Sequence, residues 1–139
     1  MGRFGLMPLS VIIAASLCAA SLSSSPTEAV SASSAHTFVK KTISSHNIVI
    51  FSKSYCPYCK RAKNVFKELN QSPHIVELDE RDDGFNIQDE LSNIVGRRTV
   101  PQVFINGKHL GGSDDTVEAY ENGALAKLLG IVVNEEDDL

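Results

Sequence analysis

After residue 35, short continuous apolar runs alternate with stretches in which apolar residues recur every three or four positions. This pattern predicts alternating strands and helices. Residues 48–51 are short, apolar and β-branched, as is typical of a buried strand. The next stretch has apolar residues at i, i+3, i+4 and i+7 and therefore predicts a helix that ends near residue 69; these positions are Ala62, Val65, Phe66 and Leu69. Residues 75–78 predict a second strand, and this β–α–β order implies parallel strands with a right-handed crossover.

Two further helices are predicted on either side of this unit. Residues 36–45 form a short helix candidate with a packing face of Phe38, Val39, Thr42 and Ile43. After the second strand, a turn at residues 82–84 leads into a helix with one apolar face, formed by Ile87, Leu91, Ile94 and Val95. Gly96 suits the end of this helix, because glycine readily adopts the left-handed conformation of a C-cap.

The last part of the domain predicts a hairpin followed by a helix. Residues 103–105 and 108–110 flank an Asn-Gly pair, which is a strong two-residue hairpin signal. Ser113 is a good N-cap for a final helix, with acidic residues in its first turn and a candidate break near Gly123. The fold class is therefore α/β, a four-stranded mixed sheet with helices on both faces. Its predicted core includes Phe66, Leu91 and Phe104.

Residues 1–35 differ from the rest of the chain and predict a leader outside the fold. Arg3 adds positive charge at the start, residues 6–20 are mostly apolar, and small residues at Cys18 and Ala20 suit signal-peptidase cleavage. This pattern predicts a secretory or extracellular address, with no stable membrane span in the mature protein because the apolar run is short. A signal anchor and an organellar transit peptide are the alternatives, so plastid, mitochondrion and cytoplasm also remain candidate locations.

Composition limits the rest of the interpretation. The 139 residues allow one ordinary domain, predicted at residues 36–131, before an acidic tail at 132–139. A hydrophobic content of 42% is sufficient for a packed core, and a net charge of −4 gives no support to nucleic-acid binding. Three cysteines are too few for a disulfide scaffold.

The candidate chemistry lies in Cys56-Pro57-Tyr58-Cys59, where the first strand gives way to a helix. Pro57 suits the first helical turn. Cys56 would then lie near unpaired backbone N–H groups and the positive end of the helix dipole, which favour the thiolate. Basic residues add positive charge nearby, namely Lys53, Lys60, Arg61 and Lys63. The arrangement predicts a redox-active pair for thiol–disulfide exchange.

Two other interpretations of the cysteine pair are weaker. A structural zinc site needs two more ligands at suitable spacing, but the remaining cysteine is Cys18 in the leader and the four histidines are scattered singly. A purely structural disulfide is disfavoured because closing so short a loop removes little chain entropy. No metal is therefore expected in the favoured interpretation.

Three separated motifs carry a resemblance to a known family. They are Lys-Ser-Tyr-Cys-Pro-Tyr-Cys at 53–59, Arg-Thr-Val-Pro at 98–101 and Gly-Gly-Ser-Asp-Asp at 111–115. Over residues 36–131 the chain resembles the dithiol glutaredoxins, and in particular plant members that carry a leader. The resemblance implies a thioredoxin-like fold and a monomeric, glutathione-dependent oxidoreductase. Its implied substrates are protein–glutathione mixed disulfides and disulfide-bonded proteins.

The resemblance also implies the residues that would bind glutathione, which is the co-substrate. Thr99, Val100 and Pro101 would lie beside the cysteine pair, with Pro101 in the cis form and the Val100 backbone pairing with the ligand as an added strand would. The glycine carboxylate is assigned to Lys53 and Gln88. The remaining candidates are Arg97 or Arg98 for the same carboxylate, Ser113 and Asp114 for the γ-glutamyl end, and Tyr58 for one wall of the cleft.

In the implied mechanism Cys56 attacks a protein–glutathione mixed disulfide and keeps the glutathione. A second glutathione then resolves the adduct, or Cys59 does so by forming the intramolecular disulfide. Cys59 lies one turn inward, where burial favours the neutral thiol.

Other function classes compete with this mechanism. A glutaredoxin-like dimer could hold an iron–sulfur cluster through Cys56 and glutathione, but the proline after the first cysteine stiffens the site. A thioredoxin reduced by a reductase is disfavoured, since the chain has no tryptophan. A secreted disulfide isomerase would need a more oxidising pair, and a sequence does not give a reduction potential.

Overall fold

The computed structural model describes residues 26–132, so most of the predicted leader and residues 133–139 of the predicted tail lie outside the described residues. The described elements, in chain order, are α1 (Pro26–Ser45), β1 (Ile48–Ser52), α2 (Pro57–Glu68), β2 (His74–Glu77), a 3-10 turn η1 (Leu78–Glu80), α3 (Gly84–Val95), β3 (Gln102–Ile105), β4 (Lys108–Gly111), α4 (Ser113–Glu121) and α5 (Ala124–Leu128).

The four strands form one mixed sheet in the order β2-β1-β3-β4. β1 is parallel to β2, whereas the pairs β1–β3 and β3–β4 are antiparallel. Each predicted strand is present, and the predicted parallel pairing around α2 is confirmed. The hairpin is also confirmed, with φ values of 50° at Asn106 and 80° at Gly107. Positive φ at both positions is what a type I′ turn requires.

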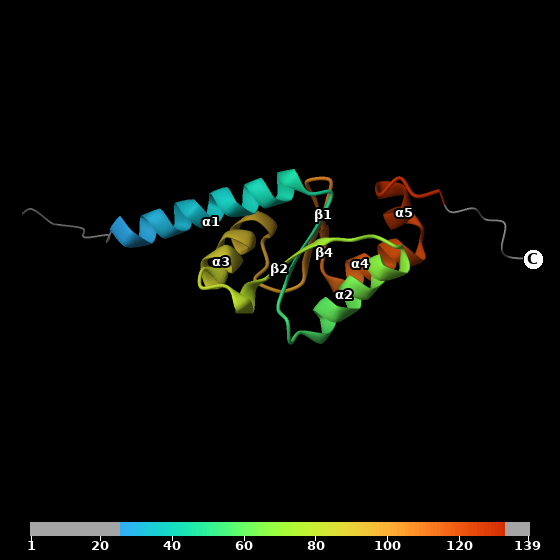
Figure 1. Ribbon diagram of the computed structural model, residues 1–139, viewed down its shortest axis with the longest axis horizontal. Helices are drawn as coiled ribbons and strands as arrows, with labels where there is room; N and C mark the ends of the chain where they lie inside the picture. The colour runs from blue at the N-terminus through green and yellow to red at the C-terminus, as the bar shows by residue number, and fades with distance from the viewer. Residues whose placement is uncertain (1–25, 133–139) are drawn as a thin grey trace, which may run out of the picture.

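Helices cover both faces of the sheet, as predicted, and Figure 1 shows α1 beside α3 and α2 beside α4. Successive residues of β1 point to opposite faces, so its continuous apolar run feeds two cores. Phe51 packs with α1 and α3 in a cluster that includes Val39, Ile87, Leu91 and Phe104. Ile50 packs with α2, α4 and α5 in a second cluster that includes Phe66, Val103, Ala119 and Leu125.

α1 begins at Pro26 rather than near residue 36, so the helix crosses the boundary predicted for the leader. Its predicted packing face is correct, because Val39 and Thr42 are buried and Phe38 and Ile43 are partly buried. The extra turns contact α3, where Asn86 Nδ2 donates to Ser31 Oγ at 2.6 Å. Because this contact is polar and joins distant segments, the Ser/Ala-rich sequence shows no apolar periodicity that could have predicted it.

Two smaller predictions are wrong. Ile94 is 43% exposed, because it lies at the flank of the packed face of α3 and lines an open groove with Lys40 of α1, whereas Val95 of the same turn packs against the core. The N-cap of α4 is Gly112, not Ser113. The carboxylate of Asp115 caps the helix by accepting from the Gly112 N–H at 2.8 Å, so Ser113 lies inside the first turn.

The remaining boundaries are close to prediction. Gly96 ends α3 with a φ of 78°, and Gly123, with a φ of 79°, separates α4 from the short α5. Among the described residues, no helix combines the length and the apolar character that crossing a membrane requires.

Candidate active site

The predicted site residues gather at the edge of the sheet where β1, β2 and β4 end and β3 begins. Three helices start at this edge, with α2 after β1, α3 after η1 and α4 after β4. Phe51 is paired with Gln102, so the residues preceding Gln102 lie across from those that follow Phe51 toward the cysteine pair. Helix N-termini carry unpaired N–H groups and partial positive charge, so this edge favours anions and thiolates.

Cys56 is the N-cap of α2 and Pro57 is at its first helical position, as predicted. The Cys56 N–H donates to the Lys53 carbonyl at 3.1 Å, which folds the loop between β1 and α2 back on itself. The Cys56 side chain is partly exposed, whereas Cys59 is 0% exposed, and both are free thiols. Tyr58 lies between them with 62% of its surface exposed.

Burial raises the pKa of the Cys59 thiol to about 11. The Cys59 sulfur contacts the side chains of Cys56 and Ser52 and the backbone of Lys53. Cys59 is therefore a neutral thiol near pH 7, while Cys56 is the sulfur that a substrate can reach. The structure separates an accessible cysteine from a protected one within a single helical turn.

Asp79 anchors the loop that carries Cys56. Its Oδ1 accepts from the Ser54 backbone N–H at 2.9 Å, and its Oδ2 accepts from the Ser54 hydroxyl. These two hydrogen bonds hold the pKa of the Asp79 carboxyl below its usual range. Since Ser54 lies two residues before Cys56, η1 fixes the approach to the nucleophile.

Lys53 and Gln88 line one cavity of about 260 Å³ beside this loop. Lys53 comes from the loop after β1 and Gln88 from α3, so the fold brings together two residues that are far apart in the sequence. The exposed rings of Tyr55 and Phe85 form part of the wall. The floor includes Gly84, where an added Cβ would lie 1.8 Å from the Leu78 carbonyl oxygen.

The Val100–Pro101 peptide bond is cis, which confirms the expectation from the resemblance. Two residues that sequence reasoning missed hold this segment. The side-chain amide of Gln102 donates to the Thr99 carbonyl oxygen at 2.9 Å and to its hydroxyl at 3.1 Å. Nε2 of His109 in turn donates to Oε1 of Gln102 at 2.7 Å. The pKa of His109 is lowered, chiefly by burial.

The start of α4 lies against the cis-proline segment, because a Cβ on Gly112 would be 3.7 Å from the Pro101 carbonyl oxygen. Ser113 is buried there, and within the described residues its Oγ has no hydrogen-bond partner. Asp114 is exposed and pairs with Arg61 of α2 at 2.8 Å. The first turn of α4 therefore offers one buried, unsatisfied hydroxyl and one exposed carboxylate.

The two candidate arginines contact acidic side chains and lie at the rim. Arg97 is 3.7 Å from Asp115, and Arg98 pairs with Asp89. The Arg98 guanidinium also lies 4.5 Å from the centre of the Phe85 ring. Both arginines are exposed, so they add positive charge to the rim of the site.

Comparison with known proteins agrees with this geometry. The Glutaredoxin family model matches residues 48–110. Glutaredoxin-C4 of Arabidopsis thaliana is 76% identical over 102 residues, which are 73% of this chain and 76% of that protein. Glutaredoxin-C8 of Oryza sativa subsp. japonica is 59% identical over 136 residues, which are 96% of this chain and 94% of that protein. The chain belongs to the glutaredoxin family.

A solved structure agrees with the fold. The glutaredoxin in the buckwheat glutaredoxin–glutathione complex is 40% identical, with a TM-score of 0.71. The match covers 73% of this chain and 92% of the buckwheat chain. The fold is therefore thioredoxin-like, and the protein is a glutaredoxin oxidoreductase with a CxxC pair that depends on glutathione.

This glutaredoxin carries a second group of polar residues that the sequence did not predict. Ser52 Oγ donates to Oε2 of Glu77 at 2.6 Å, and Nζ of Lys63 donates to the other oxygen of the same carboxylate. Ser52 also contacts the Cys59 thiol. The sequence does place Glu77 directly after two apolar residues in a predicted strand, which could have drawn attention to it. Nothing in the sequence identifies Ser52 as its cross-strand partner.

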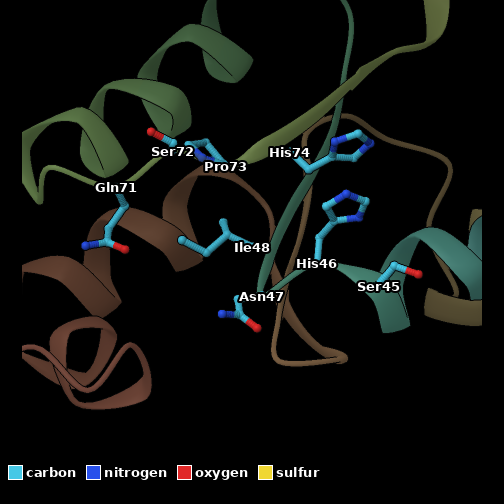
Figure 2. A pocket seen from close by; sticks show the side chains of 8 residues that line it. All are labelled: Ser45, His46, Asn47, Ile48, Gln71, Ser72, Pro73 and His74. Atoms are coloured by element: carbon cyan, nitrogen blue, oxygen red, sulfur yellow. The ribbon is translucent and has the colours of Figure 1, made fainter.

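A hollow of about 470 Å³ lies at the opposite end of the β1–β2 pair. Figure 2 shows His46 and His74 beside one another there, and their rings stack at 3.8 Å between centroids. The pKa of His74 is lowered by burial and by the proximity of His46. This hollow contains none of the residues that the glutaredoxin resemblance implied.

Proposed function

We propose that this glutaredoxin reduces protein–glutathione mixed disulfides and protein disulfides, with Cys56 as the nucleophile. The observation that carries the proposal is the asymmetry of the two thiols. Cys56 is partly exposed at the N-terminus of α2, while Cys59 is completely buried and has a raised pKa. A nucleophile must be both accessible and ionised, and the helix N-terminus favours the thiolate.

The reaction proceeds in two exchanges. The Cys56 thiolate attacks the glutathione sulfur of the mixed disulfide, and the substrate thiolate leaves with the electron pair of the broken S–S bond. The resulting Cys56–glutathione disulfide is then attacked by a second glutathione, which releases glutathione disulfide. Alternatively, Cys59 attacks the Cys56 sulfur and releases glutathione. Each exchange forms one S–S bond and breaks another, so electrons balance without a metal.

The cavity beside the thiols supports the proposed site for the glycine end of glutathione. Lys53 provides a positive charge and Gln88 provides an amide donor on the same cavity wall, which suits a carboxylate. The backbone of Val100 is presented by the cis bond to Pro101, and Thr99 is held by Gln102. An extended peptide-like ligand can pair with such a backbone as an additional strand. Tyr58, exposed between the cysteines, is the proposed wall.

The first turn of α4 supports the proposed site for the γ-glutamyl end. A buried hydroxyl without a partner is energetically unfavourable, and a ligand carboxylate accepting from Ser113 Oγ would satisfy it. Asp114 is assigned to the ligand ammonium. Its ion pair with Arg61 is largely exposed and therefore weak, so the carboxylate can exchange partners.

The comparisons do not favour the iron–sulfur alternative over the oxidoreductase. Pro57 at the first helical position fixes the backbone next to Cys56, which fits a pre-arranged dithiol pair. Visible absorbance after anaerobic purification would support the iron–sulfur cluster-binding function instead. For the oxidoreductase, we propose a monomer.

We also propose that the leader directs the chain to the secretory pathway. The support is the order of positive charge, apolar run and small residues before residue 36. A fluorescent fusion to residues 1–35 should enter the endoplasmic reticulum, and the same fusion in chloroplasts or mitochondria would contradict the proposal.

Steady-state reduction of a small glutathione mixed disulfide tests the function, with glutathione, glutathione reductase and NADPH as the electron supply. Wild type should turn over and Cys56→Ser should lose turnover by about 10³-fold or more, because no other group replaces the nucleophile. Cys59→Ser should retain this reaction, since glutathione can resolve the adduct. Activity in Cys56→Ser, or no activity in fully reduced wild type, would contradict the proposal.

A further inference from the structure

The Cys59 thiol is enclosed, so its proton must leave through a protein group when this sulfur attacks Cys56. Its side chain is 0% exposed on the buried face of α2, and Ser52, also 0% exposed, alternates with Ile48 and Ile50 on the face of β1 that α2 covers. The Cys59 sulfur contacts the Ser52 and Cys56 side chains and the Lys53 backbone there. A backbone N–H is a donor only. In the mixed disulfide, the Cys56 sulfur is already bonded to glutathione. Of these contacts, the Ser52 hydroxyl is the group that can accept the proton.

Ser52 connects the thiol to a carboxylate at the solvent edge. Ser52 and Glu77 are direct partners in the parallel register of β1 and β2, and Ser52 Oγ donates to Glu77 Oε2 at 2.6 Å. Ser52 is 0% exposed, whereas the side chain of Glu77 is 19% exposed. β2 is an edge strand of the sheet. The contacts therefore run continuously from a buried sulfur to water.

The charged surroundings of Glu77 keep this path aligned. Nζ of Lys63, from α2, donates to Oε1 of Glu77, which leaves Oε2 directed at Ser52. The nearby carboxylate of Asp79 in η1 is occupied by both donors of Ser54 and does not contact Ser52. The Glu77 carboxylate is thus held between the Lys63 ammonium group and the Ser52 hydroxyl.

We propose that Ser52 and Glu77 form the exit path for the Cys59 proton when the Cys56–Cys59 disulfide closes. This inference rests on the proposed function, because it concerns the second of the two resolving routes. The Cys59 proton passes to Ser52 Oγ as the Ser52 proton passes to Glu77 Oε2. The Cys59 electron pair forms a bond to the Cys56 sulfur, and the bond from Cys56 to glutathione breaks. Glutathione leaves as a thiolate, and Glu77 releases the proton to water.

Rapid-quench mass spectrometry separates this step from the one before it. Reduced full-length protein is mixed with glutathione disulfide and quenched with acid, and the mixed-disulfide and intramolecular-disulfide masses are followed over time. If wild type forms no mixed disulfide, the proposed function fails. If all variants form it and close it equally fast, the proton path alone fails.

In Glu77→Gln and in Ser52→Ala, the mixed disulfide should persist about 100-fold longer or more at pH 7, which is the low end of what a general acid or base contributes. Glu77→Asp keeps a carboxylate and should restore closure to within about threefold of wild type. Glu80→Gln removes an exposed carboxylate of η1 and serves as the matched control, with unchanged closure.

The pH profile distinguishes a proton path from a structural role. In Glu77→Gln, closure should rise about tenfold per pH unit between pH 6 and 8, because hydroxide must then take the proton, while the wild-type rate changes little. Loss of rate with the wild-type pH slope would indicate a structural effect and overturn the inference. Circular dichroism checks folding, and Ser52→Ala decides the question if Glu77→Gln does not fold.

Discussion

The two ends of the β1–β2 pair both bring polar side chains together, but they do so in opposite electrostatic surroundings. At the carboxyl end, Ser52 meets Glu77 and three helices begin. At the amino end, His46 stacks on His74 near the C-termini of α1 and α2. Helix N-termini favour anions, while C-termini favour cations. Thiolate and carboxylate chemistry therefore belongs to the first end, although the larger hollow lies at the second.

The comparison shows that proximity and cavity size do not by themselves identify a site. The cavity at the carboxyl end is the smaller of the two, at about 260 Å³ against about 470 Å³. It nevertheless has an accessible thiol beside it, a cis-proline backbone and an unsatisfied Ser113 hydroxyl at the same edge. At the amino end, burial and, to a smaller extent, the proximity of His46 lower the pKa of His74.

Gly84→Ala should disrupt the carboxyl end most strongly. The new Cβ would lie 1.8 Å from the Leu78 backbone oxygen, so η1 or α3 must move. We expect the free energy of unfolding to fall by about 3 kcal/mol, measured by urea denaturation, with an accompanying loss of glutathione affinity. Gly112→Ala is the matched control, since its Cβ meets only an ordinary contact at 3.7 Å. A loss of less than about 1 kcal/mol is expected there, and equal losses would contradict this account.

Alkylation should reveal the asymmetry of the two cysteines at the carboxyl end. At pH 7 the reduced protein should react with iodoacetamide at Cys56 about 100-fold faster than at Cys59, because the raised pKa leaves Cys59 almost entirely protonated and burial blocks access. Peptide mapping after timed quenching measures both rates. Comparable labelling of the two sulfurs would show that the thiols are not differentiated.

The same pKa shift predicts a pH dependence of stability. The folded pKa of Cys59, about 11, lies above the ordinary value of 9.0, so the folded state of the reduced protein retains this proton more strongly than the unfolded state. The stabilisation is complete below about pH 9 and is lost as the pH rises toward 11. Urea midpoints for wild type should therefore fall more steeply over this window than those for Cys59→Ala. Parallel curves would contradict the shift.

At the amino end, we expect the stability to depend less strongly on pH and in the opposite direction. His74 has a lowered pKa, so the unfolded state binds its proton more readily and stability falls as the pH drops below about 6.5. His74→Gln should weaken this acid sensitivity in urea midpoints between pH 7.5 and 5, with no change in reduction of the glutathione mixed disulfide. A large loss of that activity would place the histidines in the catalytic machinery and remove the contrast between the ends.

Sequence periodicity and turn residues were enough to predict the elements that position the thiols. Pro57 lies at the first position of α2, and Asn106-Gly107 forms the hairpin turn. Such signals act within a few residues of where they occur. The cis form of Pro101 came from the resemblance alone, because a local sequence pattern does not determine the isomer of an X–Pro bond.

The features that sequence reasoning missed depend on contacts between distant segments. Ser52 meets Glu77 through the strand register, and Gln102 reaches His109 across the hairpin. The N-terminal part of α1 likewise contacts α3, through the hydrogen bond from Asn86 to Ser31. Ile94 follows the apolar period of α3 but lies at the flank of its packed face, in an open groove beside α1. In each case, the environment of the residue is fixed by tertiary packing.

Trapping the glutathione adduct tests the central claim, which is that Cys56, and not Cys59, is the sulfur that attacks the substrate disulfide. Reduced Cys59→Ser is treated with glutathione disulfide and mapped by peptide mass spectrometry, beside Cys56→Ser under the same conditions. The account predicts one glutathione on Cys56 of the first variant and none on Cys59 of the second. An adduct on Cys59, or no adduct on Cys56, would contradict it.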